Sequence, residues 1–304
     1  MAIITDSNQA LIDNQAFLHS LNVKGVEKAA GAMTDFVRVK IRELSFARKI
    51  LPPQNVTSTD LVPDLYTDQP RRIVEMDIPS TAYSVTFLDQ AMEKYYKGKK
   101  FPVYYVKYES EKFVKPVEEI MTYRTPIKTI VQENYLKDLQ AAEDGAFIQA
   151  VDAIIADREA ALPGDALYTV SGPLKPGMIA EGLKKLVNKK VPTGTILINE
   201  MDFLDLLKLE QASVGSSVVE DIIVNGFSYT KLLGQTFIRT IKHEVVAPGN
   251  IYLFTTPDYL GVFDILTDVK AFIKQEASML EFYLYESVGM AIGNVNGVAK
   301  ITLT

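Results

Sequence analysis

The stretch from Pro126 to Arg158 has the hydrophobic pattern of one long amphipathic helix. Its apolar residues recur at near three- to four-residue spacing: Ile127, Ile130, Val131, Leu139, Ala142, Ala146, Val151, Ile154 and Ile155. Pro126 suits a first helical turn, and Leu162-Pro163-Gly164 ends the pattern. A helix of about 50 Å is far longer than is usual in globular proteins. The pattern therefore predicts a spine helix in a structural protein or a long surface helix of an ordinary enzyme.

Gly145 lies in the middle of this predicted helix, in AAEDGAFIQ. Glycine inside a helix costs about 1 kcal/mol relative to alanine, so its presence needs a cause. A neighbouring element could pack against the bare backbone, or the helix could bend there and change its curvature. Both causes stay open, and we favour the bend.

The chain up to Leu51 is helical in character and locally basic. Phe36, Val39, Leu44 and Phe46 form a loose apolar pattern, which Pro52-Pro53 ends. Between residues 24 and 49, seven Lys and Arg stand against three acidic residues. The ordinary interpretation is a solvated helix face, and the alternative is a segment that faces a polyanion. The candidates for that basic segment are Arg38, Lys40, Arg42, Arg48 and Lys49.

Residues 52–115 alternate like strands but contain little apolar material. RRIVEMDI, AYSVTFL and FPVYYVKYE have a period of two, while prolines interrupt any helix. The segment cannot bury a core of its own, so it predicts an extended hairpin or arm whose exposed edge another chain covers. KYYKGKKF could bind single-stranded nucleic acid, but a hairpin tip with soluble lysines is the favoured interpretation. The candidates for contacts between subunits are Arg71, Arg72, Lys97, Lys99 and Lys100.

The remainder of the chain predicts a mixed α/β region followed by strands. TVSGPLKPGMIAEGLKKLV reads as a turn and a helix, PTGTILINE as a buried strand, and MDFLDLLKL as a helix. Asn225-Gly226 signals a tight turn. Five strand-like runs close the chain: NIYLFTT, LGVFDIL, VKAFIK, LEFYLYESVGMAIG and VAKITLT. The fold class is α+β.

Composition and motifs point away from catalysis. The chain has 304 residues, a formal net charge of −6, no Cys and two His, which leaves no thiolate site and argues against a protein dedicated to nucleic acid. Phosphate-binding glycine loops and a nucleophile elbow are missing. We read Asp202 and Asp205 as a solvated helix N-terminus, Glu143-Asp144 as a weak acid/base pair, and His243 as a surface residue. We expect no cofactor, metal, signal peptide or membrane span.

The order of these parts resembles the major capsid proteins of tailed bacteriophages, whose fold encapsulin nanocompartments share. RELSFARKILPPQNVTSTDL resembles the arm that leads into the family's extended loop, and the sequence from VYYVKYE to AFIQAV resembles its return strand and spine helix. GTILINEMDFLDLLKL resembles the strand-helix unit of the axial domain. The passage from LLGQTFIRTIKHE to YLGVFDI resembles the return to the peripheral sheet.

The resemblance implies an architecture and a function. We expect an N-terminal arm over 1–51, an extended loop over 52–115, a peripheral domain from 116–163 and 246–304, and an axial domain over 164–245. Copies would form pentamers and hexamers of an icosahedral shell around double-stranded DNA, with the basic segment facing the lumen. A portal protein and a scaffolding protein would be partners, a decoration protein could join them, and no contact with a membrane is expected. The protein would reside in the virion after assembly in the host cytoplasm.

Two alternatives stay open. An encapsulin-type shell would enclose a cargo enzyme in place of a genome. A metal-dependent enzyme would use carboxylate ligands such as Glu200 and Asp202. No cross-linking pair or maturation cleavage site is identifiable in the sequence.

Overall fold

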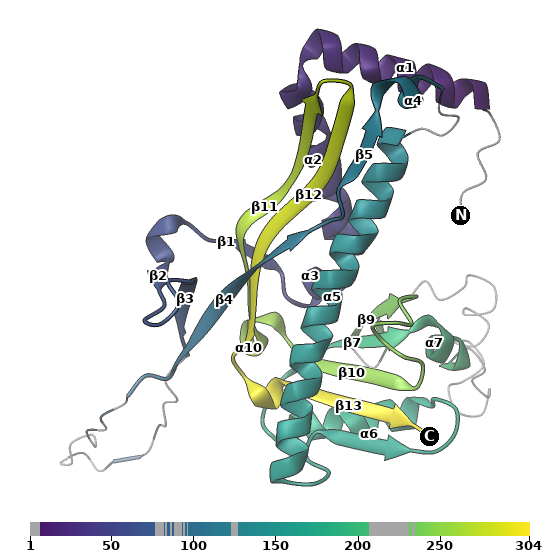
Figure 1. Ribbon diagram of the computed structural model, residues 1–304. Helices are drawn as coiled ribbons and strands as arrows, with labels where there is room; N and C mark the ends of the chain where they lie inside the picture. Colours follow the sequence, from purple (N-terminus) through teal and green to yellow (C-terminus); the bar gives the residue numbers. More distant parts are fainter. Residues whose placement is uncertain are drawn as a thin grey trace.

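A long central helix connects two β-sheets in this computed structural model (Figure 1). The structure describes residues 7–76, 82, 84–85, 87, 93, 95, 97–122, 127–206, 231–232 and 235–304. The spine helix α5 spans Ile127–Ala161, 35 residues, which confirms the helix that the apolar spacing predicted. One end of α5 packs on the first sheet through Tyr135 and Leu139, and the other contributes Phe147 and Val151 to the core beside the second sheet.

The first sheet is built around a long antiparallel hairpin. Its strand order is β1-β11-β12-β4-β3-β2, and β5 also pairs with β12. The bounds are β1 Pro53–Asn55, β2 Val62–Pro63, β3 Pro70–Glu75, β4 Lys100–Glu109, β5 Phe113–Pro116, β11 Gly261–Glu276 and β12 Met279–Ile292. LGVFDIL and VKAFIK, predicted as separate strands, form the single strand β11, whose register against β12 shifts around Thr267. The long hairpin of β11 and β12 thus packs against the spine helix and also pairs, through β4, with the strands at the base of the extended loop.

The second sheet has the order β6-β13-β10-β7-β9-β8. The bounds are β6 Leu167–Val170, β7 Thr193–Asn199, β8 Lys231–Leu232, β9 Gln235–Thr240, β10 Asn250–Thr255 and β13 Val298–Leu303. Helix α6, Pro176–Val187, packs against it so closely that a Cβ at Gly182 would lie 2.6 Å from the Ile301 side chain. The buried strand and helix predicted from PTGTILINE and MDFLDLLKL are β7 and α7, Glu200–Leu206.

The sheet topology corrects one predicted boundary. The sequence predicts that residues 246–304 belong wholly to the peripheral domain, but β10 and β13 pair with each other, and β10 pairs with β7 of the second sheet. Only β11 and β12 of that stretch belong to the first sheet. The chain leaves the second sheet after β10, forms the long hairpin, and returns.

The N-terminal segment is helical, as predicted, but buries a different face. Its helices are α1 Ser7–Lys24, α2 Val26–Leu44 and α3 Ala47–Ile50. Met33, Val37 and Ile41 of α2 are buried against the first sheet. Three of the four predicted apolar positions are exposed, with Phe36 at 39%, Val39 at 58% and Leu44 at 52%, whereas Phe46 is buried. For α2 the predicted pattern was wrong. The residues that pack on the sheet recur every four positions from Met33, and the looser run that begins at Phe36 lies on another face of the helix.

Short elements complete the described chain. They are α4 Val117–Thr122, α10 Pro257–Leu260, η1 Ser58–Asp60 and η2 Val295–Gly297. The predicted turn at Asn225-Gly226 lies outside the described residues, as do Tyr83, Thr86 and Leu88 of the predicted strand AYSVTFL; the other four residues of that stretch are not in a strand. Within the described residues, no helix is both long and apolar enough to cross a bilayer.

Candidate assembly interface

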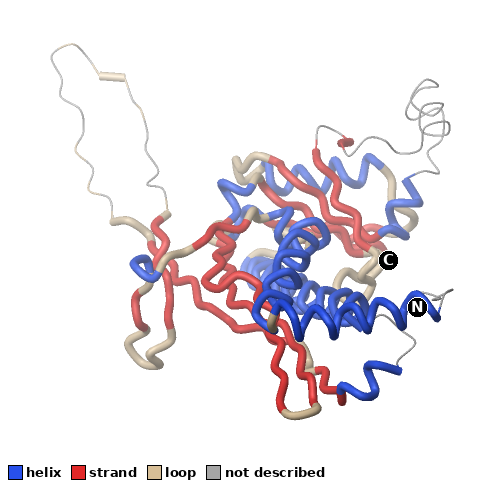
Figure 2. The backbone as a smooth tube through the Cα atoms, turned by 90° about the horizontal axis from the view of Figure 1, so that it is seen from above, coloured by secondary structure: helices blue, strands red, loops and turns tan. Residues whose placement is uncertain are grey.

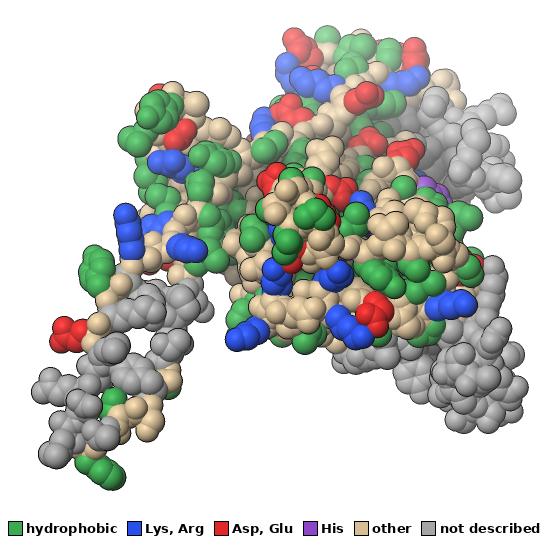
Figure 3. All heavy atoms as spheres, turned by 90° about the horizontal axis from the view of Figure 1, so that it is seen from below, with side chains coloured by type: hydrophobic (Ala, Val, Ile, Leu, Met, Phe, Trp, Pro, Cys, Tyr) green, Lys and Arg blue, Asp and Glu red, His purple; other side chains and the backbone are tan. Residues whose placement is uncertain are grey.

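The strands β2, β3 and the first part of β4 project from the body of the molecule (Figure 2). Large apolar side chains on this projection are exposed: Val62, Leu65, Tyr66, Phe87 and Tyr95. Leu65 is 84% exposed and Tyr66 is 93% exposed. In the space-filling view, green apolar side chains gather on the described part of the projection (Figure 3). A concentration of this kind marks a surface that another molecule covers, so this projection is the candidate interface.

The foot of the projection is fixed to the body through a buried carboxylate. Asp264 of β11 is fully buried, accepts a hydrogen bond from Arg72 at 2.8 Å, and accepts another from the Tyr105 hydroxyl at 3.2 Å. Burial raises the pKa of Asp264, and the Arg72 guanidinium opposes that rise. The projection therefore leaves the body in a defined direction, because β3, β4 and β11 share this anchor.

The basic residues predicted for contacts between subunits divide into two groups. Arg71 pairs with Asp64 at 3.0 Å, Arg72 with Asp264, and Lys100 with Glu75, all inside the chain. Lys97 and Lys99 are exposed. For Arg71 and Arg72 the structure thus shows a role in holding the loop's own foot, while Lys97 and Lys99 stay candidates for contacts with a neighbour.

The predicted basic segment is also divided. Arg38 pairs with Asp268 at 2.8 Å, Lys40 is half-buried, Lys49 is exposed, and the side chain of Arg42 lies outside the described ones. Arg48 is a correction, because its side chain is 1% exposed and pairs with Glu143 and Glu286. An arginine buried among carboxylates presents no charge to a polyanion, so Arg48 does not belong to a basic surface.

The turn from Ser45 to Arg48 docks on the middle of the spine helix, which the sequence did not suggest. Asp144 accepts hydrogen bonds from the Ser45 hydroxyl at 2.9 Å and from the Ala47 N–H at 3.0 Å, and it pairs with Lys242. Glu143 and Asp144 are both fully buried. Their reading as weak acid/base candidates missed this role. A usable signal was present, since Glu143 lies four residues from Leu139 and from Phe147 on the apolar stripe.

The carboxylates considered as metal ligands have other partners. Glu200 lies 3.6 Å from Arg239, and Asp202 accepts a hydrogen bond from the Gly249 N–H at 2.7 Å. Asp202 is 7% exposed, so its reading as a solvated residue was wrong, and burial raises its pKa. His243 is exposed, as predicted. Across the described ranges, no group of three or more His, Asp or Glu could hold a metal ion.

Gly145 directly follows the docked pair and has open space beside it. A Cβ at Gly145 would meet no atom of another element within 4 Å, so close packing inside the chain does not explain the glycine. The bend remains a prediction.

We expect Gly145→Ala to raise the free energy of unfolding of the isolated subunit by about 1 kcal/mol, because alanine favours the helix and meets no clash. Denaturant unfolding measures this. A useful control is Gly194→Ala, whose Cβ would lie 2.6 Å from the Thr255 backbone and should destabilise the subunit by about 1–3 kcal/mol. If Gly145→Ala lowered the free energy of unfolding, the conclusion that a side chain fits beside Gly145 without a clash would be wrong.

Comparison with solved structures identifies the fold. No protein-family model and no curated protein matches the sequence. A structure from Microbacterium phage Oxtober96 matches with a TM-score of 0.61 at 10% identity, over 86% of this chain and 91% of that one. The mature capsid of bacteriophage PhiM1 matches with a TM-score of 0.57 at 10% identity, over 86% and 87% of the two chains. This chain has the fold of a phage capsid subunit.

A virus-like particle from another organism also has a similar fold. A virus-like particle from Pyrococcus furiosus matches with a TM-score of 0.51 at 16% identity, over 89% of this chain and 98% of that one. These matches confirm the α+β fold class and the capsid fold that the order of sequence elements implied.

Proposed function

We propose that the chain is a major capsid protein that assembles into an icosahedral shell around double-stranded phage DNA. The observation that carries this proposal is the combination of the capsid fold with a firmly anchored projection that exposes Leu65 and Tyr66. An exposed strand-rich arm with apolar side chains invites association, and many copies of such an arm would build a closed lattice. Pentamers and hexamers of the chain are the expected building blocks.

Sedimentation and electron microscopy of the purified protein test this function. We expect large closed or tubular particles, either from the protein alone or with a scaffolding protein. A stable monomer at high concentration, with a scaffold and at raised salt, would contradict the proposal. Particles filled with a cargo protein and lacking DNA would favour the encapsulin-type alternative.

Further partners follow from the proposed function. A portal protein, a scaffolding protein and a possible decoration protein would join the shell, which would assemble in the host cytoplasm and become part of the virion. DNA would contact the lumenal face without sequence specificity, through phosphate contacts that salt weakens.

Charge reversal on α2 tests the lumenal contact. We expect Lys40→Glu with Arg42→Glu to lower the DNA content of particles while particle shape is unchanged, and the loss should be largest at low salt because raised salt screens the phosphate contacts of the wild type as well. Arg38 is left intact because it pairs with Asp268. The matched control is charge reversal at Lys175, which precedes the first residue of α6, together with Lys184 within α6. Equal DNA retention in both double variants would contradict a lumenal role for α2.

A further inference from the structure

One buried arginine connects three separate parts of the chain. Arg48 of α3 donates from Nε to Glu143 Oε2 on the spine helix at 2.9 Å, and from Nη2 to Glu286 Oε2 on β12 at 2.7 Å. The Arg48 side chain is 1% exposed and the two glutamate side chains are 0% exposed. The N-terminal segment, the spine helix and the long hairpin therefore meet at a single guanidinium.

The charges at this joint do not balance. Two carboxyl groups share one guanidinium, and both Glu286 Oε1 and Arg48 Nη1 lack a hydrogen-bond partner among the described residues. An uncompensated buried carboxylate is costly, and a bound proton removes that cost. Burial, followed by the nearby Glu143, raises the pKa of Glu286 to about 9, against the opposing effect of Arg48.

The two carboxyl groups have different roles. Glu143 receives hydrogen bonds from both Nε and Nη2 of Arg48, whereas Glu286 receives one from Nη2. Two-point pairing with a guanidinium suits an ionised carboxylate. Glu143 is thus the ionised partner of Arg48, and Glu286 is the group that carries the proton.

The surrounding elements favour the same assignment. Asp144 on the spine helix is compensated by Lys242. Tyr108 on β4 and Asp268 on β11 are the other titratable groups that act electrostatically on the joint. Tyr108 is neutral at physiological pH, and Asp268 already pairs with Arg38. No cation among these groups is available to pair with Glu286 in place of the proton.

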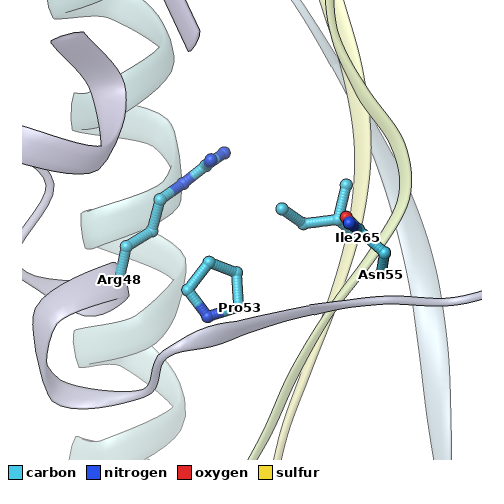
Figure 4. Close-up of a pocket in the computed structure, with 4 residues that line it drawn as sticks. All are labelled: Arg48, Pro53, Asn55 and Ile265. Carbon is cyan, nitrogen blue, oxygen red and sulfur yellow. The ribbon is translucent and has the colours of Figure 1, made fainter. Parts of the chain in front are cut away.

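Space for proton exchange lies beside the joint. A cavity of about 300 Å³ is lined by Arg48, Pro53, Asn55 and Ile265. Figure 4 shows the Arg48 side chain extending from α3 toward the strands of the hairpin. A cavity of this volume has room for water, which would reach the joint at the side chain of Arg48, the one residue of the three that lines the cavity.

We propose that Arg48, Glu143 and Glu286 form a proton-dependent latch, which holds the segment from Ser45 to Leu51, including α3, between the spine helix and the hairpin. With the proton on Glu286 the joint is neutral overall and closed. Without the proton it contains one uncompensated negative charge and loosens. All three residues of the latch belong to one chain, so the latch can be tested on the isolated subunit whether or not the protein forms shells.

The direction of the pH effect follows from the raised pKa. The folded chain holds a proton on Glu286 that the unfolded chain releases near the ordinary glutamate pKa of about 4.3. The stability from the latch is therefore complete below that pH, falls as pH rises, and is lost once pH passes about 9. Between these two pH values, the folded state binds one more proton than the unfolded state.

Glu286→Gln tests the latch, because glutamine has the shape of the protonated acid and cannot ionise. Glu281→Gln is the matched control, on the same strand and paired with Lys112 at 3.0 Å. From pH 6 to 8 we expect the unfolding constant of the wild type to rise about tenfold per pH unit relative to that of Glu286→Gln, and Glu281→Gln to follow the wild type. Parallel pH profiles of wild type and Glu286→Gln would overturn the proposal.

Two further measurements separate the latch from a merely structural contact. Amide exchange in residues 46–51 should accelerate above pH 9 in the wild type and not in Glu286→Gln, after correction for intrinsic rates. Glu143→Gln should be destabilised at pH 7 far more than Glu286→Gln, and equal losses would contradict the assigned roles. Should Glu286→Gln not fold, infrared spectroscopy of the wild type decides: a buried neutral carboxyl band at pH 7 supports the latch, and its absence refutes it.

Discussion

Replacing residues 77–98 by a two-residue Asn-Gly turn is expected to abolish closed particles and to leave the body of the subunit folded. The foot of the loop allows this change, because Glu75 pairs with Lys100 and the Met76 N–H donates to the Lys99 carbonyl at 2.8 Å. The two strands are therefore adjacent where the turn would be inserted, and Asn-Gly suits a two-residue hairpin. Electron microscopy and sedimentation measure particle formation, and thermal unfolding measures the body.

A larger replacement provides the control. Removing residues 60–100 also removes Arg72 and leaves the buried carboxylate of Asp264 without its cation. Breaking a buried ion pair in this way costs about 3–5 kcal/mol, so this variant should unfold at a lower temperature than the shorter replacement. Normal particles from the shorter replacement would contradict the role of the loop in assembly. Equal thermal stability of the two variants would contradict the Asp264 anchor.

The parts of the fold that the sequence predicted are those governed by local periodicity. The spine helix and the strands β7, β10 and β13 each show a continuous apolar pattern, and each lies where the pattern placed it. The order of these elements was enough to indicate the capsid fold. The boundary error at residue 246 has a different origin, because pairing of β10 with β7 and β13 depends on contacts that no local pattern encodes.

The buried polar joint was not predictable from local patterns. Glu143 and Glu286 lie 95 and 238 residues after Arg48 along the chain. Arg48 belongs to a locally basic segment and Glu286 to a strand-like run, and neither pattern indicates a buried ion pair. A buried charge becomes visible only when its partners are known. The one local sign was the position of Glu143, four residues from Leu139 and from Phe147 on the spine helix. This position indicated that Glu143 is buried, but it did not indicate which residue pairs with it.

A second buried arginine, Arg158, holds the far end of the spine helix. Its Nε donates to Asp165 Oδ2 at 3.0 Å, and its Nη1 donates to the backbone carbonyls of Val295 at 3.1 Å and Val298 at 2.6 Å. The side chain is 8% exposed. Arg158 therefore connects the end of the helix, the turn after it, and the start of β13. Burial acts to raise the pKa of Asp165, but Lys189 and Arg158 outweigh it and hold that pKa below its usual range.

We expect Arg158→Met to lower the free energy of unfolding at pH 7 by about 3 kcal/mol, the lower end for a broken buried pair, because Lys189 still pairs with Asp165 at 2.7 Å. A carboxylate with a lowered pKa adds stability above its unfolded pKa and loses it as the pH falls through the folded value. The gap between wild type and variant should therefore narrow below about pH 4. Lys184→Met, which removes an exposed pair with Glu181, should change stability by less than about 0.5 kcal/mol. Denaturant unfolding measures all three proteins, and a loss for Arg158→Met no larger than that for Lys184→Met would show that this arginine does not hold the helix end.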